Sequence, residues 1–107
     1  MLSIPANTRL FLCKTPVNMR KSFDGLSDLV EELFPKQLLT GAFFIFLNRK
    51  RDQMKVVCWD GDGLVIWSKR LEKGSFPRRH EDHLQRRDFF MLLEGVVPYR
   101  KTPRFSL

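Results

Sequence analysis

The stretch that decides the fold is 42-AFFIFLNRKRDQMKVVCWDGDGLVIWSKR-70, in which two short polar turns separate three strand-like runs. The first run, 42–47, is apolar at every position, which is typical of a strand buried on both faces. The runs 54–59 and 64–67 are rich in β-branched and aromatic residues. Asp60-Gly61 between two such runs is a strong hairpin signal. The stretch predicts an antiparallel β-meander with cationic ends.

Strand and helix patterns lie on both sides of this meander. Residues 8–14 alternate as a strand does, and Asn18 is a good N-cap for a helix from about Met19 to Phe34. Pro35 ends that helix, and a second helix fits about Arg86 to Glu94. Each helix has an apolar stripe: Phe23, Leu26, Val30 and Leu33 in the first, and Phe89, Leu92, Leu93 and Val96 in the second.

The predicted fold class is therefore α+β, an antiparallel β-meander of about four strands with a helix after the first strand and a short C-terminal helix. A chain of 107 residues is one domain. We assign residues 1–96 to this single α+β domain. Residues 97–107 form a basic C-terminal tail that we expect to be extended or disordered when free.

The first predicted helix has two further features. Gly25 costs it roughly 1 kcal/mol relative to alanine, and we expect a close approach of helix to sheet at this point. The face opposite the apolar stripe is acidic and is most simply a solvated surface, although docking to a basic partner is the functional alternative. Its acids are Asp24, Asp28, Glu31 and Glu32.

The charge balance favours a polyanionic partner, nucleic acid first. The chain has 19 Lys and Arg against 12 Asp and Glu, a net charge of +7. Residues 1–68 hold nine cations and seven acids, and residues 69–107 hold ten cations and five acids, so the second part contributes +5. The alternative is a basic protein that binds no anion specifically.

Cysteine usage and hydropathy indicate a reducing, cytoplasmic setting. Cys13 and Cys58 are the only cysteines and do not make a disulfide framework. The N-terminus lacks the charged and long apolar regions of a signal peptide. No apolar run approaches the roughly 20 residues of a membrane helix, so no membrane partner is expected.

Four motifs together resemble a known family. They are MRKSFDGL at 19–26, KVVCWDGDG at 55–63, SKRLEKG at 68–74 followed by Phe76, and LLEG at 92–95. In this order and spacing the chain, from Pro5 to Leu107, resembles the small TnpB-type accessory proteins encoded by bacterial insertion sequences of the sixty-six group. The resemblance implies a role in DNA transposition and recombination of a mobile element, beside a larger transposase that carries the cutting and joining chemistry.

The chain departs from the family pattern at two places. Family members commonly have a Trp-Pro pair just after the position of Phe76, where this chain has Pro77 followed by Arg78 and Arg79. Gln85 lies where a Ser or Thr would usually cap the second helix. Both departures concern the segment 77–86 and leave the core unaffected.

We predict no catalytic activity, cofactor or metal. Asp60 and Asp62 lie on a tight turn, where setting the turn geometry is a simpler role than metal binding. His80-Glu81-Asp82-His83 places four candidate ligands together, but the sequence offers no obvious completing ligand, and an exposed linker is favoured. Trp59 and Trp67 are expected in the core rather than stacked on bases.

Binding is thus the predicted function, with DNA (the transposon ends) and the cognate transposase as partners. In a meander, the 48–52 turn and the segment after Lys69 lie at the same end of the sheet. A protein adaptor of the transposase with little DNA affinity is the alternative, and an RNA-binding or regulatory module unrelated to transposition is a third possibility. The predicted nucleic-acid-binding residues are Arg20, Lys21, Arg49, Lys50, Arg51, Lys69, Arg70, Lys73, Arg78, Arg79, Arg86, Arg87, Arg100, Lys101 and Arg104.

Overall fold

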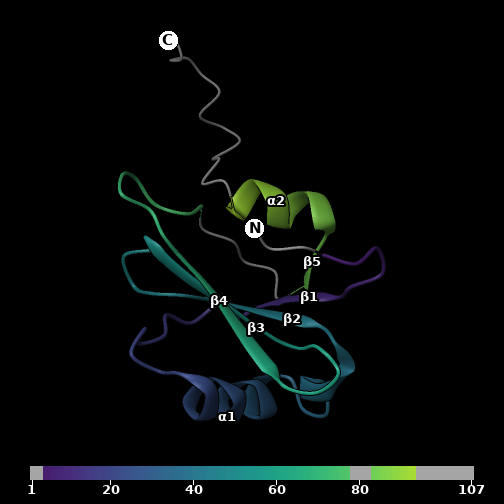
Figure 1. Cartoon of the computed structure of the whole chain (residues 1–107). Helices are drawn as coiled ribbons and strands as arrows, with labels where there is room; N and C mark the ends of the chain where they lie inside the picture. The colour runs from purple at the N-terminus through teal and green to yellow at the C-terminus, as the bar shows by residue number, and fades with distance from the viewer. Residues whose placement is uncertain (1–3, 78–82, 94–107) are drawn as a thin grey trace.

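The computed structural model of the chain describes residues 4–77 and 83–93, which build a mixed β-sheet with a helix on each face (Figure 1). The strand order across the sheet is β4-β3-β2-β1-β5. Within these residues no helix has the length and apolar character to cross a membrane. The elements are, in chain order, β1 (Leu10–Leu12), α1 (Phe23–Leu33), the 3-10 helix η1 (Leu38–Thr40), β2 (Phe43–Leu47), β3 (Gln53–Trp59), β4 (Leu64–Arg70), β5 (His83–Leu84) and α2 (Arg86–Leu93).

The sheet is partly parallel, so the prediction of a purely antiparallel meander was wrong. β2, β3 and β4 do form consecutive antiparallel pairs, with Ile45 opposite Val56 and Val57 opposite Ile66. β1, however, pairs with β2 in parallel, with Phe11 opposite Phe44. The reason is the connection between the two strands. Residues 13–42 carry α1 across one face of the sheet and return the chain to the end of the sheet at which β1 started, so β2 runs in the same direction as β1. β5 adds a short antiparallel strand on the far side of β1.

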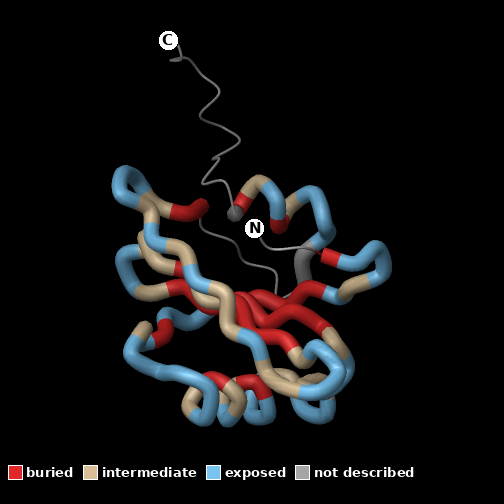
Figure 2. Tube along the Cα trace, in the orientation of Figure 1, coloured by how far each residue is buried: buried red, intermediate tan, exposed pale blue. Residues whose placement is uncertain are grey.

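β2 lies at the centre of the core and is buried at all five positions, as an apolar run of this kind predicts (Figure 2). Phe44 and Phe46 belong to the cluster that α1 covers, together with Leu26 and Val30. The opposite face of β2 belongs to a second cluster, which includes Phe89 of α2. Large-to-small changes here would cost several kcal/mol, because each would remove buried apolar atoms and leave a cavity.

α1 begins later than its sequence pattern predicts. The helix starts at Phe23, after an N-cap at Ser22 that makes no side-chain capping bond. Asn18, the predicted N-cap, instead closes a turn ahead of the helix: its Oδ1 accepts a hydrogen bond from the Arg20 amide at 2.8 Å, and its carbonyl accepts one from the Lys21 amide at 3.1 Å. The reason for the shift is that this turn satisfies the amides that a longer helix would leave unpaired.

The explanation predicted for Gly25 was also wrong. A Cβ on Gly25 would lie 3.3 Å from both Cβ and Cγ of Lys21, and the sheet is not among its nearest neighbours. The glycine therefore gives room to the lysine stem beside the first turn of α1.

Two other expectations are met in part. α2 starts at Arg86 and buries Phe89 and Leu92. Trp59 and Trp67 are half-buried, and Trp67 packs against the cluster on the α2 face. The predicted boundary at residue 96, the tail 97–107 and the helix position Val96 lie outside the described residues.

Candidate nucleic-acid interface

Three segments that are distant in the sequence meet where β1, β2 and β4 end, at the left of Figure 1. The 13–22 loop joins the end of β2, just before the 48–52 turn, through the Val17 amide, which donates to the Leu47 carbonyl at 2.9 Å. The segment 71–77 joins the same turn through the Phe76 amide and the Arg51 carbonyl at 2.6 Å. We call this end of the sheet the basic edge. Its cations are Lys14, Arg20, Lys21, Arg49, Lys50, Arg51, Lys69, Arg70 and Lys73.

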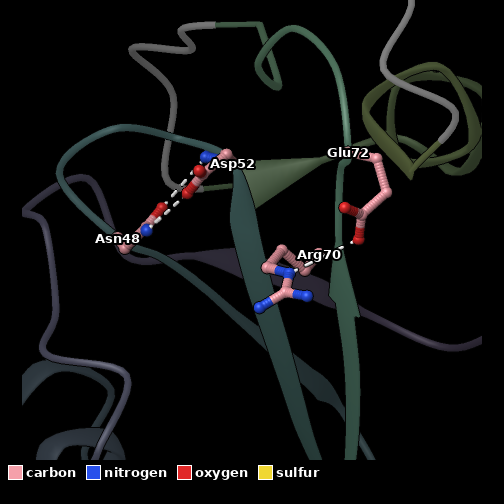
Figure 3. A network of polar contacts seen from close by, with 4 residues as sticks. All are labelled: Asn48, Asp52, Arg70 and Glu72. Carbon is pink, nitrogen blue, oxygen red and sulfur yellow. Dashed lines mark hydrogen bonds and ion pairs between the residues drawn. The ribbon is translucent and has the colours of Figure 1, made fainter.

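The 48–52 turn at the centre of this edge is held rigidly by Asn48. The Asn48 Oδ1 accepts hydrogen bonds from the amides of Asp52 and Gln53, both at 3.0 Å. Its Nδ2 donates to Oδ1 of Asp52 at 2.7 Å (Figure 3). Asp52 is thereby turned toward the asparagine, and the exposed tip of the turn consists of Arg49 and Lys50.

Arg51 has a structural task in addition to its charge. It adopts a left-handed backbone with φ of 57°, which is uncommon for a residue with a side chain. Its Nε donates to the carbonyl of Phe76 at 3.1 Å, and Phe76 is fully buried. We therefore expect Arg51 to fix the 71–77 segment against the turn more than to contact a ligand.

Lys55 holds the pre-helix loop, and the predicted interface did not include it. From β3, its Nζ donates to the carbonyls of Met19 at 2.8 Å and Lys21 at 2.9 Å. Charge-assisted bonds of this kind are stronger than neutral ones. The loop that carries Arg20 and Lys21 is thus tied to the sheet, with both cationic side chains exposed.

A groove of about 550 Å³ lies between the pre-helix loop and the 48–52 turn. It opens at the carboxyl ends of the parallel strands β1 and β2, the position where open α/β sheets commonly bind their ligands. One wall consists of cationic and amide side chains together with Asp52, whose carboxylate is hydrogen-bonded to Asn48, and the pre-helix loop lines the other. This lining suits an anionic backbone better than an apolar ligand. The lining residues are Pro16, Val17, Asn18, Met19, Asn48, Arg49, Lys50, Asp52 and Gln53.

The third segment, which follows β4, adds positive charge that one acid, Glu72, partly neutralises. Nε of Arg70 lies 3.5 Å from Oε2 of Glu72, and both side chains are largely exposed (Figure 3). An exposed pair of this kind contributes little to stability and leaves the arginine available. Lys73 is exposed as well.

The structure does not bring all the predicted residues to this edge. Arg86 lies at the opposite end, where its guanidinium donates to the carbonyls of Ile4 at 2.7 Å and Pro5 at 2.9 Å and lies 5.5 Å from the ring centre of Phe90. Arg87 is exposed on the same first turn of α2. Arg78, Arg79, Arg100, Lys101 and Arg104 are outside the described residues.

The end opposite the basic edge carries both signs of charge, and its acids gather on the β3–β4 turn and the end of α1. Asp60 and Asp62 form the β3–β4 turn there, and Glu31 and Glu32 lie near the last turn of α1. Hydrogen bonding with Asp62, through its side chain first and its backbone second, lowers the pKa of Asp60. Across residues 4–77 and 83–93 no three His, Cys, Asp or Glu side chains converge as metal ligands would.

These features define a class of protein: a small α+β domain with a basic groove at one edge of its sheet. The IS66 Orf2-like family model ("IS66 Orf2 like protein") matches residues 8–102, and the chain belongs to this family. The suspected resemblance to the accessory proteins of the sixty-six group is thereby confirmed. The family is associated with transposition as an accessory protein and is not a known catalytic family.

Two relatives come from Sinorhizobium fredii. "Uncharacterized protein y4jC" is 27% identical over 100 residues, which cover 90% of this chain and 86% of the relative. "Uncharacterized protein y4hO" is 33% identical over 76 residues, which cover 71% of this chain and 66% of the relative. No solved structure matches the chain.

Proposed function

We propose that this protein is a non-catalytic accessory factor of DNA transposition that contacts DNA, the transposon ends in particular, through its basic edge. It would act in the bacterial cytoplasm beside the cognate transposase. The observation that supports this proposal most strongly is the convergence of three cationic segments at one end of the sheet, two of which line the groove. Phosphate contacts by such side chains release counterions, so they give affinity with little sequence preference.

The contacts divide by role. Arg49 and Lys50 stand on the rigid turn and would neutralise phosphates directly. Arg20 and Lys21 would do so from the opposite side of the groove, on the loop that Lys55 holds. Because both supports are fixed before binding, the ordering cost on contact is small.

Binding of a duplex transposon end should be measured by fluorescence anisotropy as a function of salt concentration. The variant Arg49→Gln/Lys50→Gln should bind more weakly and reduce the slope of log K against log salt by about 1.8, because each phosphate that is no longer neutralised accounts for about 0.9. The matched control, Lys36→Gln/Arg87→Gln, removes the same charge away from the basic edge and should leave the slope unchanged. Equal effects of the two variants would show that net charge, rather than the groove, governs binding.

A second candidate is an adaptor that binds the transposase without DNA. The exposed face of α1 supports it, because four acids accompany two apolar side chains there, Phe23 and Leu33, which are 48% and 42% exposed. The adaptor function predicts capture of the transposase in the absence of DNA, loss of that capture in Asp28→Lys/Glu31→Lys, and no DNA binding at low salt. A pull-down with and without transposon-end DNA separates the two candidates.

A further inference from the structure

β4 is a long, regular strand at the edge of the sheet. It pairs with β3 without interruption from Leu64 opposite Trp59 to Arg70 opposite Gln53. Among the described residues, the strand order leaves its other side without a neighbouring strand. Proteins usually protect such an edge with a bulge, a proline, charged side chains or a very short strand. β5, at the other edge, has two residues, whereas β4 has seven, contains neither proline nor bulge, and carries charge only at its last two positions, Lys69 and Arg70.

The phase of the backbone hydrogen bonds shows which groups point outward. The Leu71 amide donates to the Asp52 carbonyl at 2.7 Å, and the Asp60 amide donates to the Gly63 carbonyl at 3.1 Å. In an antiparallel ladder, hydrogen-bonded and non-hydrogen-bonded pairs alternate, so the odd-numbered residues of β4 bond to β3. The amides and carbonyls of the even-numbered residues therefore point away from the sheet. They are Leu64, Ile66, Ser68 and Arg70.

The side chains along β4 are suited to pairing with a second copy of the same strand. On the α2 face, Val65 is 38% exposed and Trp67 is half-buried. On the α1 face, Leu64 and Ile66 are half-buried. A cross-strand neighbour would remove this apolar surface from water, and aromatic pairs with β-branched residues are among the stabilising ones in antiparallel sheets.

The two ends of β4 carry opposite charges. Asp60 and Asp62 precede the strand, and Arg70 ends it. Two copies of β4 that paired in parallel would place Asp62 against Asp62 and Arg70 against Arg70. Antiparallel pairing instead places Asp62 of one copy against Arg70 of the other, where it competes with the exposed Glu72 that lies 3.5 Å from this arginine. Antiparallel pairing of identical strands is also the arrangement that a two-fold axis produces.

We propose that β4 is a self-association edge, at which a second copy of this chain pairs antiparallel to give a continuous ten-stranded sheet. The register centred on Ile66 uses all these features. It sets Leu64 opposite Ser68 of the other copy, Val65 opposite Trp67, and Asp62 opposite Arg70. This proposal does not rest on DNA contact, because Arg49 and Lys50 of the basic edge are not part of the β4 strand that would pair.

Ser68→Pro tests the pairing in the full-length protein. The Ser68 amide points outward, so proline there spares the β3–β4 ladder and removes one intermolecular donor from each copy. Sedimentation velocity should show the wild type moving from 12.7 kDa to twice that mass as concentration rises. Dimerisation should weaken roughly 10- to 30-fold in Ser68→Pro, and Ser68→Thr should dimerise as the wild type does.

A charge exchange tests the direction and register. Within one copy, residues 62 and 70 are eight apart along an extended strand, about 26 Å, and cannot form an ion pair. Asp62→Lys and Arg70→Asp alone should each weaken dimerisation roughly 3- to 10-fold, and the double variant should recover most of the loss. Because Asp62 and Arg70 are exposed, these variants still test the proposal if Ser68→Pro does not fold. A wild type that stays monomeric, a dimer insensitive to Ser68→Pro, or a double variant without recovery would each overturn the proposal.

Discussion

The two ends of the sheet are built from similar parts but differ in charge and rigidity. The 48–52 turn presents Arg49 and Lys50 on a scaffold fixed by Asn48, whereas the β3–β4 turn presents Asp60 and Asp62. A seven-residue strand separates these ends by about 23 Å, which exceeds the screening length of roughly 8 Å at physiological salt. Opposite charges on successive turns of a meander therefore do not cancel, and the molecule has a positive turn and a negative turn at opposite ends of the sheet.

The largest expected effect comes from reversing the charge at each end. Arg49→Glu/Lys50→Glu replaces two phosphate contacts with two repulsions and should lower the affinity for duplex DNA on the order of 100-fold. Asp60→Lys/Asp62→Lys changes the net charge by the same amount at the other end and should alter the affinity less than about threefold. Anisotropy titrations at one salt concentration compare them. A comparable gain in the second variant would contradict a localised interface.

The next effect concerns the loop that only the basic edge possesses. Lys55→Met removes both bonds to the carbonyls of Met19 and Lys21 and should cost about 2 kcal/mol of unfolding free energy in urea titrations. DNA affinity should also fall several-fold, because Arg20 and Lys21 lose their support. Lys14→Met, an exposed lysine on the same edge, is the control and should change stability by less than 0.5 kcal/mol, roughly the limit for surface sites. Similar losses in both variants would argue against a supporting role for Lys55.

A smaller effect distinguishes the two turns themselves. Asn48→Ala leaves the amides of Asp52 and Gln53 without their acceptor and should destabilise the protein by about 1–2 kcal/mol. Asp60 is exposed and its contact from the Asp62 amide is long, at 3.4 Å, so Asp60→Ala should destabilise the protein much less than Asn48→Ala does. Chemical denaturation measures both. An Asp60→Ala variant as unstable as Asn48→Ala would show that the acidic turn is held equally firmly.

The smallest effect is the titration of Asp60. Its folded pKa lies below its unfolded value, so its contribution to stability is present above the unfolded pKa and is lost as pH falls through the folded pKa. Carboxyl chemical shifts followed by NMR should show Asp60 titrating below the range usual for aspartate, and Asp62→Ala should move it back toward that range. An unshifted titration in the wild type would exclude the hydrogen bonding at this turn.

Much of the sheet could be predicted because its signals are local. The apolar run at 43–47 and the Asp-Gly turn set β2, β3 and β4 without knowledge of distant residues. The parallel pairing of β1 could not be predicted, because three residues such as Leu10–Leu12 carry no information about direction or partner. The start of α1 was missed for a related reason: Asn18 is a good cap for a turn as well as for a helix.

The candidate interface could be predicted where local turns determine its position. The meander correctly placed the 48–52 turn beside the segment after Lys69. The role of Arg86 was not predictable, since its carbonyl partners lie some 80 residues away in the sequence. Lys55 did leave a signal: it shares a strand face with buried Val57, and a lysine on an apolar face usually has a fixed partner.

The position of β2 has a consequence for the order of folding. One side of this strand meets β3 across a five-residue turn, and the other meets β1 across the long 13–42 connection. Closing a long connection costs more entropy than closing a hairpin, so the hairpins should form in the transition state and β1 should dock afterwards. Val57→Ala would then slow refolding, whereas Leu12→Ala would mainly accelerate unfolding, and the reverse pattern in stopped-flow experiments would refute this order. On this route the groove is the last part of the molecule to be assembled, because its second wall arrives only with β1.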